Sequence, residues 1–159
     1  MGEGVKHGRL KHPGRRRSHL GGDSVYWYNG LIVSSEIARG LDIFELLPSG
    51  LITQNELDAA RTVRWDYLNA QEQRKIVWPA SFAKARAFLD QLERSNGLAA
   101  ARLIAVRSDL AAAEKASGSA RQAALKKLAT QLSAEAAKSS DQPKTRMLVD
   151  AIRELVTAR

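Results

Sequence analysis

The stretch "SVYWYNGLIVSSEIARGLDIFELLPSG" (residues 24–50) places short runs of aromatic and β-branched residues between turn residues. Asn29 and Gly30 separate the first two runs, and this dipeptide favours a type I′ turn because both central residues need a positive φ. A second break at Gly40 precedes "LDIFELL". The pattern therefore predicts a β-hairpin plus a third strand over 24–47, with at least one sheet edge left unpaired.

Helical patterns follow the predicted strands. Thr53 and Glu56 have the spacing of a capping box, which predicts a helix from about Gln54. The periodicity of "NELDAARTVRWDYLNAQEQRKI" predicts that this first helix runs to about residue 76. Trp78 and Pro79 are expected to end it, with Pro79 at the first position of the next helix because proline is favoured there.

Four further apolar stripes predict four amphipathic helices with short connections. Asn96 and Gly97 are expected to form a left-handed end to the first of these four helices. The stripes are Phe82, Ala85, Leu89 and Leu92; Leu103, Val106, Leu110 and Ala113; Leu125, Leu128, Leu132 and Ala136; and Leu148, Ala151, Ile152 and Leu155.

The predicted fold is therefore mainly α, an antiparallel helical bundle preceded by a short β-hairpin or three-strand fragment. We expect a basic arm over 1–23, the β segment over 24–47 and a helical bundle over 54–159. The length of 159 residues, with 44% hydrophobic and 26% charged residues, is typical of a globular chain.

Several classes of site are excluded or disfavoured by composition. The chain has no cysteine, which excludes disulfides, thiolate metal sites and cysteine nucleophiles. Its apolar runs are shorter than the ~20 residues that span a bilayer, so no membrane span is expected. The N-terminal basic residues lack the apolar stretch that follows them in a signal peptide.

The positive charge is concentrated at the N-terminus. The net charge is +8, and residues 1–23 carry six Lys or Arg against two acidic residues, which gives +4 for this segment. We interpret it as a flexible basic arm in which Arg15, Arg16 and Arg17 are candidate contacts to nucleic-acid phosphates. A solvated tail is the alternative, which we favour because the basic block is short. All three histidines lie in this arm at spacings of five and seven residues, which do not match a zinc motif.

All six tyrosine and tryptophan residues of the chain lie between residues 26 and 78, and arginines lie near them. Exposed rings can stack on sugars or bases, so Trp27, Arg39 and Arg64 are candidate binding residues. The alternative, which we favour, is that these rings pack together and join the hairpin to the first helix. Alternation along the strand places Trp27 on the face opposite Tyr26 and Tyr28.

The stretch "YWYNGLIVSSEIARGLDIFELLPSGLITQNELDAA" resembles the C-terminal end of the LVIVD-repeat proteins, a family of predicted secreted β-propellers. The matching features are an aromatic-Asn-Gly hairpin, an acidic-x-x-Arg-Gly-Leu-Asp-Ile-Phe signature and an Asn-Glu helix start. The resemblance implies the last strands of a propeller blade. The region after residue 80 is more loosely similar to the helical modules of FIMAH type. The matching residues are Tyr26, Trp27, Tyr28, Asn29, Gly30, Glu36, Arg39, Gly40, Leu41, Asp42, Ile43, Phe44, Asn55 and Glu56.

A whole propeller needs several four-stranded blades, and this chain has one incomplete blade. The resemblance therefore implies a fragment or C-terminal portion of a longer protein that is secreted or in the cell envelope. The localisation of this chain is left open.

The biochemical role that the sequence favours is that of a non-catalytic structural or interaction module. It is expected to contact its own propeller domain or a protein partner and to associate with a second copy through an unpaired edge. The alternative is a small basic protein that binds nucleic acid weakly through the arm. No cofactor, metal or catalytic residue is assigned. A hydrolase that uses the carboxylate pair Glu36 and Asp42, or the pair Glu56 and Asp58, is a distant third interpretation.

Overall fold

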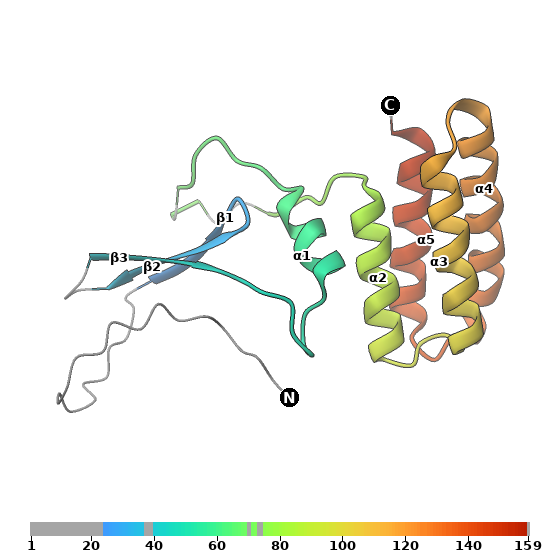
Figure 1. The fold of residues 1–159 in the computed structure, drawn as a ribbon, viewed down its shortest axis with the longest axis horizontal. Coiled ribbons are helices and arrows are strands. Elements are labelled where there is room, and N and C mark those ends of the chain that lie inside the picture. Colours follow the sequence, from blue (N-terminus) through green and yellow to red (C-terminus); the bar gives the residue numbers. More distant parts are fainter. Residues whose placement is uncertain (1–23, 37–39, 70, 73–74, 159) are drawn as a thin grey trace. The chain divides into compact units, whose positions relative to one another are not determined.

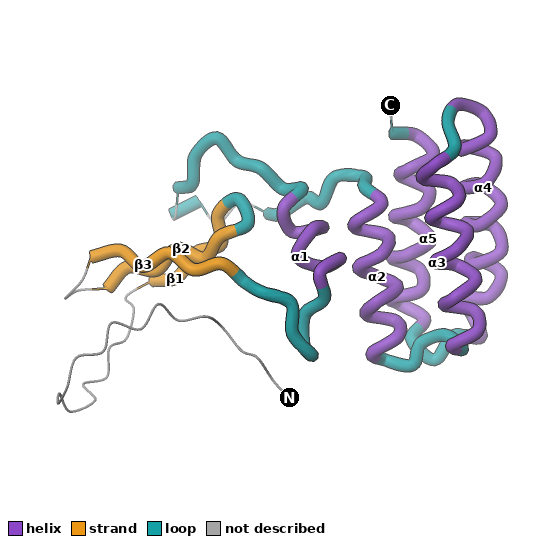
Figure 2. Tube along the Cα trace, in the orientation of Figure 1, coloured by secondary structure: helices purple, strands orange, loops and turns teal. Residues whose placement is uncertain are grey.

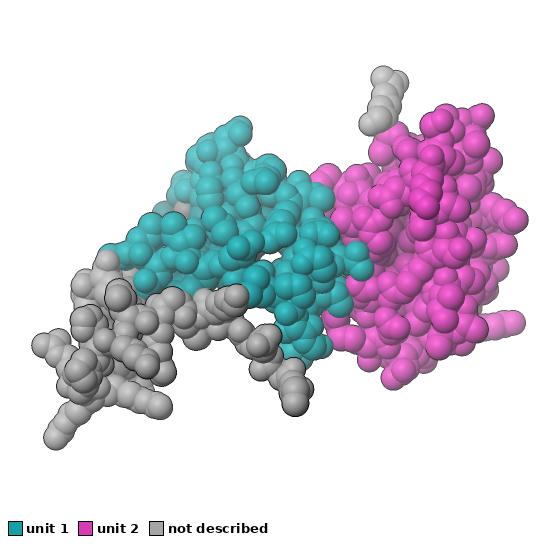
Figure 3. All heavy atoms as spheres, in the orientation of Figure 1, with its two compact units in different colours: residues 1–77 teal, residues 78–159 magenta. Residues whose placement is uncertain are grey.

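The structure is a computed structural model that describes residues 24–36, 40–69, 71–72 and 75–158. The basic arm over 1–23 lies outside the described residues. The chain divides into two compact units, Met1–Val77 (unit 1) and Trp78–Arg159 (unit 2), which are coloured separately in Figure 3. The fold is mainly helical with a small sheet before the helices, as the sequence predicts.

Unit 1 contains an antiparallel sheet of three strands in the order β1-β2-β3, where β1 is Ser24–Tyr28, β2 is Leu31–Glu36 and β3 is Gly40–Glu45 (Figure 1). Tyr28 pairs with Leu31 across a two-residue loop. Asn29 has φ 52° and Gly30 has φ 93° in that loop, so the predicted turn with two positive φ values is confirmed.

The pairing register sorts the side chains of the sheet into two faces, because partners on neighbouring strands share a face. Trp27, Ile32 and Phe44 are partners in one row, so we call this side the Trp27 face. We call the opposite side the Ile43 face. The predicted alternation of Trp27 with Tyr26 and Tyr28 is confirmed. The Trp27 face carries Val25, Trp27, Ile32, Ser34, Asp42 and Phe44, and the Ile43 face carries Tyr26, Tyr28, Leu31, Val33, Leu41, Ile43 and Glu45.

Helix α1 (Gln54–Arg61) completes unit 1, and its start agrees with the sequence. The Thr53 hydroxyl accepts a hydrogen bond from the Glu56 amide at 3.2 Å, and the Glu56 carboxylate accepts one from the Thr53 amide at 2.8 Å. This is the predicted capping box.

The prediction that this helix continues to about residue 76 is wrong, since α1 ends at Arg61. The Thr62 hydroxyl donates to the carbonyl of Ala59 at 2.6 Å. Further along, the backbone N–H and C=O of Trp65 both bond to the side chain of Asn29. These groups are then not available for helical bonds to residues four positions away, so a tertiary contact overrides the helical periodicity.

Unit 2 is a bundle of four helices, α2 (Phe82–Arg94), α3 (Ala100–Lys115), α4 (Gly118–Glu135) and α5 (Gln142–Thr157), with a short 3₁₀ helix η1 (Ala136–Lys138) after α4. Helix α2 packs against α3 and α5, and α4 also packs against α3 and α5, so the four helices close around one core. Figure 2 shows their axes running side by side.

Most of the core of the bundle comes from the apolar stripes that the sequence predicts, with Ala129 and Val149 added to them. The predicted Ala136 and Ala151 are also buried. Phe82 and Phe88 are partly buried at its border. A fully buried leucine contributes roughly 1.5–3 kcal/mol relative to an exposed one, so this core is the main source of bundle stability. Its members are Ala85, Leu89, Leu92, Leu103, Val106, Leu110, Ala113, Leu125, Leu128, Ala129, Leu132, Leu148, Val149, Ile152 and Leu155.

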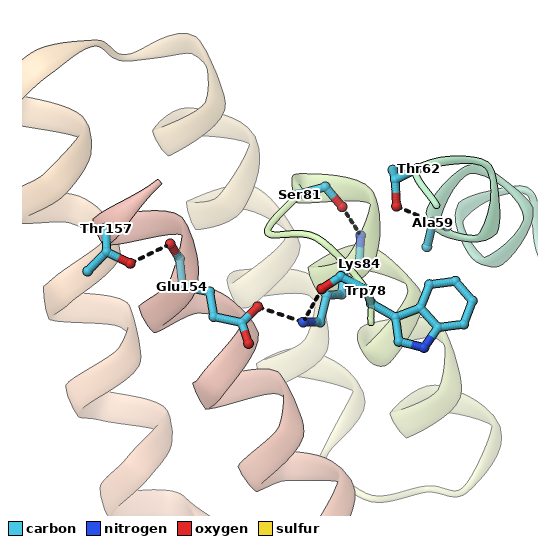
Figure 4. Close-up of polar contacts among 7 residues, drawn as sticks. All are labelled: Ala59, Thr62, Trp78, Ser81, Lys84, Glu154 and Thr157. Atoms are coloured by element: carbon cyan, nitrogen blue, oxygen red, sulfur yellow. Dashed lines mark hydrogen bonds and ion pairs between the residues drawn. The ribbon is translucent and has the colours of Figure 1, made fainter. Parts of the chain in front are cut away.

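The start of α2 differs from the prediction. Proline does not begin the helix, because Ser81 is the N-cap and its hydroxyl accepts a hydrogen bond from the Lys84 amide at 3.1 Å. The Lys84 ammonium bonds the carbonyl of Trp78 at 3.2 Å and the carboxylate of Glu154 on α5 at 2.6 Å (Figure 4). The bundle therefore begins with α2, and the predicted bundle boundary at residue 54 is too early because α1 belongs to unit 1.

The turn between α2 and α3 is tied to the turn between η1 and α5. Asn96 has φ 50° and the Gly97 amide bonds the Leu92 carbonyl at 2.8 Å, so the predicted left-handed helix end is confirmed. The buried Ser139 hydroxyl is 2.7 Å from the Gly97 carbonyl and 2.7 Å from the Thr145 hydroxyl. These bonds join two connections that are more than forty residues apart in the chain.

Candidate functional site

The hairpin turn of unit 1 holds the segment that follows α1. The Asn29 side chain donates to the Trp65 carbonyl at 2.9 Å and accepts from the Trp65 amide at 2.8 Å. The Tyr28 hydroxyl donates to the same carbonyl at 3.1 Å and to the Asp66 carbonyl at 3.2 Å. The Asn29 amide thus pairs with Trp65 as a backbone strand would, and we call this set of bonds the Asn29 clamp.

The rings of Trp27 and Trp65 meet edge to face next to the clamp. Their centroids are 6.2 Å apart and their planes make an angle of 84°. This is a favourable aromatic geometry worth about 0.5–1.5 kcal/mol beyond burial. Trp27 is half-buried and therefore contributes to the folding of unit 1. Trp27 and Tyr28 contact Trp65, and the segment that contains Trp65 is not helical. The prediction that all six rings pack together is wrong, because Tyr67 and Trp78 are exposed.

Arg61 also supports the hairpin turn, and the sequence reasoning did not assign it this role. Its guanidinium bonds Glu45 on β3 at 2.7 Å and lies 3.7 Å from Asp58 on its own helix. A Cβ atom added to Gly30 would lie 3.0 Å from the Arg61 Cγ atom. The three-residue spacing between Asp58 and Arg61 predicts an ion pair between these two residues on one helix. It does not predict the contact between Arg61 and Glu45.

The sheet exposes apolar side chains on both of its faces. On the Trp27 face, Val25 is 61% exposed and Phe44 is 41% exposed. On the Ile43 face, Leu41 and Ile43 are each 60% exposed, and Leu31 is also exposed. Antiparallel sheets usually have one apolar and one polar face, so apolar residues on both faces are typical of a sheet with a layer on each side. This pair of faces is the candidate functional surface.

The other predicted binding residues are placed as follows. Arg64 is exposed beside Trp65 in the chain. Arg39, Arg15, Arg16 and Arg17 lie outside the described residues. The structure therefore brings Trp27 together with Trp65.

The carboxylates that we considered for catalysis have structural contacts where the structure describes them. Glu56 caps α1, and Asp58 accepts a hydrogen bond from the Gln54 side-chain amide at 2.7 Å. Asp42 lies on the Trp27 face opposite Ser34, and the side chain of Glu36 lies outside the described part of the chain. Among the described residues, no group of three or more His, Asp or Glu side chains is placed to hold a metal ion.

A surface cleft of unit 2 lies next to the turn between α2 and α3. Asn96, Ala99, Lys138 and Ser140 are among its lining residues. Arg102 and Glu135 also line it and form an ion pair at 2.8 Å that links α3 to the end of α4. The cleft therefore contains a bond that stabilises the bundle. Within the described ranges, no helix is long and apolar enough to cross a membrane.

Comparison of the chain with protein-family models, curated proteins and solved structures found no match. The class that the structure defines is a mainly helical protein with a small three-stranded sheet. The two faces of that sheet expose apolar side chains.

Proposed function

We propose that this chain is a non-catalytic structural and interaction module, the C-terminal part of a β-propeller repeat protein of the kind that the LVIVD-repeat resemblance implies. In this proposal, unit 1 supplies three strands of a blade and unit 2 is the helical tail. The partner is the rest of the propeller in the same parent protein, which the resemblance implies is secreted or in the cell envelope.

The observation that carries the proposal is the exposure of apolar side chains on both faces of the sheet. Two packed sheets lie ~10 Å apart with their inner side chains interdigitated. A blade inside a propeller has a neighbouring sheet on each side and needs apolar residues on both faces. A propeller blade has four strands, whereas the sheet of unit 1 has three.

Exposed apolar surface can be measured with a dye that fluoresces on binding such surface. We expect the Val25→Thr/Leu31→Thr variant, which changes one residue on each face, to bind less dye than the unmodified chain. Threonine preserves the β propensity of both positions. The control is Ile104→Thr on α3, where an isoleucine is 69% exposed in unit 2. Equal dye binding by all three proteins would argue against the sheet as the interaction surface.

A second experiment tests the propeller part of the proposal. The chain is expressed behind the propeller repeats of a protein of the resembled family. We expect the amides of β1, β2 and β3 to exchange hydrogen more slowly than in the chain alone, and dye binding to fall. Unchanged exchange and dye binding would show that these repeats do not cover the sheet.

The alternative function is weak nucleic-acid binding through the basic arm. It is favoured by the +4 charge of residues 1–23 and by the total of +8. Such binding would weaken steeply between low and moderate salt, because each neutralised phosphate releases counterions. It would also be lost on deletion of residues 1–22, whereas dye binding by the sheet would be unchanged by that deletion.

A further inference from the structure

The outer edge of β3 has the features of a strand that pairs with another strand. Natural edge strands are usually protected by charged side chains, above all lysine, by proline or by a β-bulge. The sequence of β3, "GLDIFE", contains neither lysine nor proline, and its pairing with β2 is continuous from Gly40 to Glu45. Its two charged residues are Asp42, which lies on the Trp27 face, and Glu45, which is paired with Arg61. Among the described residues, β3 pairs only with β2.

The register of the sheet shows which backbone groups point outward from β3. In a two-residue hairpin the closing residues, Tyr28 and Leu31, exchange both hydrogen bonds, and bonded pairs alternate along the strands. Alternate residues of β2 from Ile32 therefore bond to β3. It follows that the backbone N–H and C=O groups of Leu41, Ile43 and Glu45 point away from the sheet.

These outward groups are complementary to a second copy of themselves. If β3 pairs antiparallel with β3 of another chain about a two-fold axis at Ile43, then Ile43 faces Ile43, and Leu41 faces Glu45 on either side. Each of these bonded pairs exchanges two hydrogen bonds, which gives about six across the edge. β1 is shorter, and the same alternation leaves outward groups only at Val25 and Trp27.

The side chains fit the same register. The two Ile43 side chains, each 60% exposed, would lie side by side on one face of the joined sheet. Leu41 would lie against the aliphatic part of Glu45, whose carboxylate is already paired with Arg61 at 2.7 Å. The pairing therefore brings apolar side chains together without placing two unpaired charges opposite each other.

We infer that two copies of this chain associate through their β3 edges, with the two-fold axis at Ile43, to form one continuous six-stranded sheet. The inference goes beyond the proposed function, because it adds a second copy of the chain as a further partner of unit 1. It concerns the edge of the sheet, whereas the proposed function concerns its faces. The two can therefore fail independently.

The test uses the full chain and measures its mass by light scattering over a concentration series. The expected result is a species of twice the 17.4 kDa of one chain. The Ile43→Lys variant should be monomeric, since it would place two ammonium groups opposite each other at the axis. The matched control is Val25→Lys, which introduces the same charge at an equally exposed position on the other edge strand, and it should remain a dimer.

A second measurement does not depend on a destabilising charge. The chain has no cysteine, so Ile43→Cys introduces a single thiol. A short bifunctional thiol reagent should crosslink this variant into covalent dimers much faster than it crosslinks Val25→Cys. The inference would be overturned if the unmodified chain stays monomeric or forms an open-ended assembly. It would also be overturned if Val25→Lys breaks the dimer and Ile43→Lys does not, or if the two cysteine variants crosslink equally fast. A monomer that still binds dye at the sheet would leave the proposed function standing.

Discussion

Gly97→Ala is the substitution for which the structure gives the sharpest expectation. A Cβ atom at residue 97 would lie 2.5 Å from the Leu92 Cδ2 atom and 2.9 Å from the Asp141 Cβ atom. Both distances are below those found in real structures, so the Leu92 side chain, which is buried in the core, and Asp141 at the start of α5 must shift or the turn must open. The Gly97 carbonyl also accepts a hydrogen bond from the Ser139 hydroxyl, and a shift of the backbone at residue 97 would weaken that bond.

The expected cost is about 1–3 kcal/mol, which is typical of an added methyl group in a well-packed core. For a domain with the length of unit 2, each kcal/mol lowers the midpoint of thermal unfolding by about 4–8 °C. The assay is thermal unfolding followed by circular dichroism at a helical wavelength. Gly50→Ala is the control, because an added Cβ at Gly50 meets no atom within 4 Å and the midpoint should be unchanged.

A double-mutant cycle identifies the contact that is responsible. Leu92→Val removes the Cδ2 atom and should cost about 1 kcal/mol by itself. Because it also removes the closest clash, Gly97→Ala should cost less in the Leu92→Val background than in the unmodified chain. If Gly97→Ala leaves the midpoint unchanged, or if the two costs simply add, the argument from close packing at this turn is wrong.

Three further predictions follow from bonds that the structure shows. Asn29→Gly keeps a residue that accepts positive φ but removes both bonds to Trp65, so the Trp65 amide should lose hydrogen-exchange protection while the bundle amides keep theirs. Ser139→Ala should lower the free energy of bundle unfolding by about 1–3 kcal/mol, because it leaves the buried Thr145 hydroxyl and the Gly97 carbonyl with fewer partners. Replacing Glu154 with Gln should cost about 1 kcal/mol or less, and the cost should shrink in high salt, because its ion pair with Lys84 is partly exposed.

Local patterns in the sequence were sufficient to predict most of the elements. The Asn29-Gly30 turn, the capping box at Thr53 and the apolar stripes of unit 2 each depend on residues close together in the chain, and each prediction is confirmed. The end of α1 could not be predicted in this way. It is set by contacts between Asn29 and Trp65, which are 36 residues apart, and helical periodicity contains no information about such a partner.

The candidate surface was only partly predictable. Alternation along β1 placed Trp27 and Tyr26 on opposite faces, as the register shows. Which faces remain uncovered depends on what else folds over the sheet, and this is a tertiary property. The register of β3 could not be predicted from the sequence either. A shift of one residue would turn the backbone N–H and C=O groups of Asp42, and not those of Ile43, toward the outer edge of the sheet.

The order in which the four helices of unit 2 are synthesised has a consequence for how this unit folds on the ribosome. Helix α5 is made last, yet it contacts both α2 and α4 and supplies Leu148, Val149, Ile152 and Leu155 to the core. A nascent chain that ends before Gln142 therefore exposes the apolar sides of three helices and should be cleaved readily by protease. Protection is expected only when α5 has emerged, so this unit reaches its native state after synthesis of all four helices. The β1–β2 hairpin, which needs only neighbouring residues, can form as soon as it leaves the ribosome.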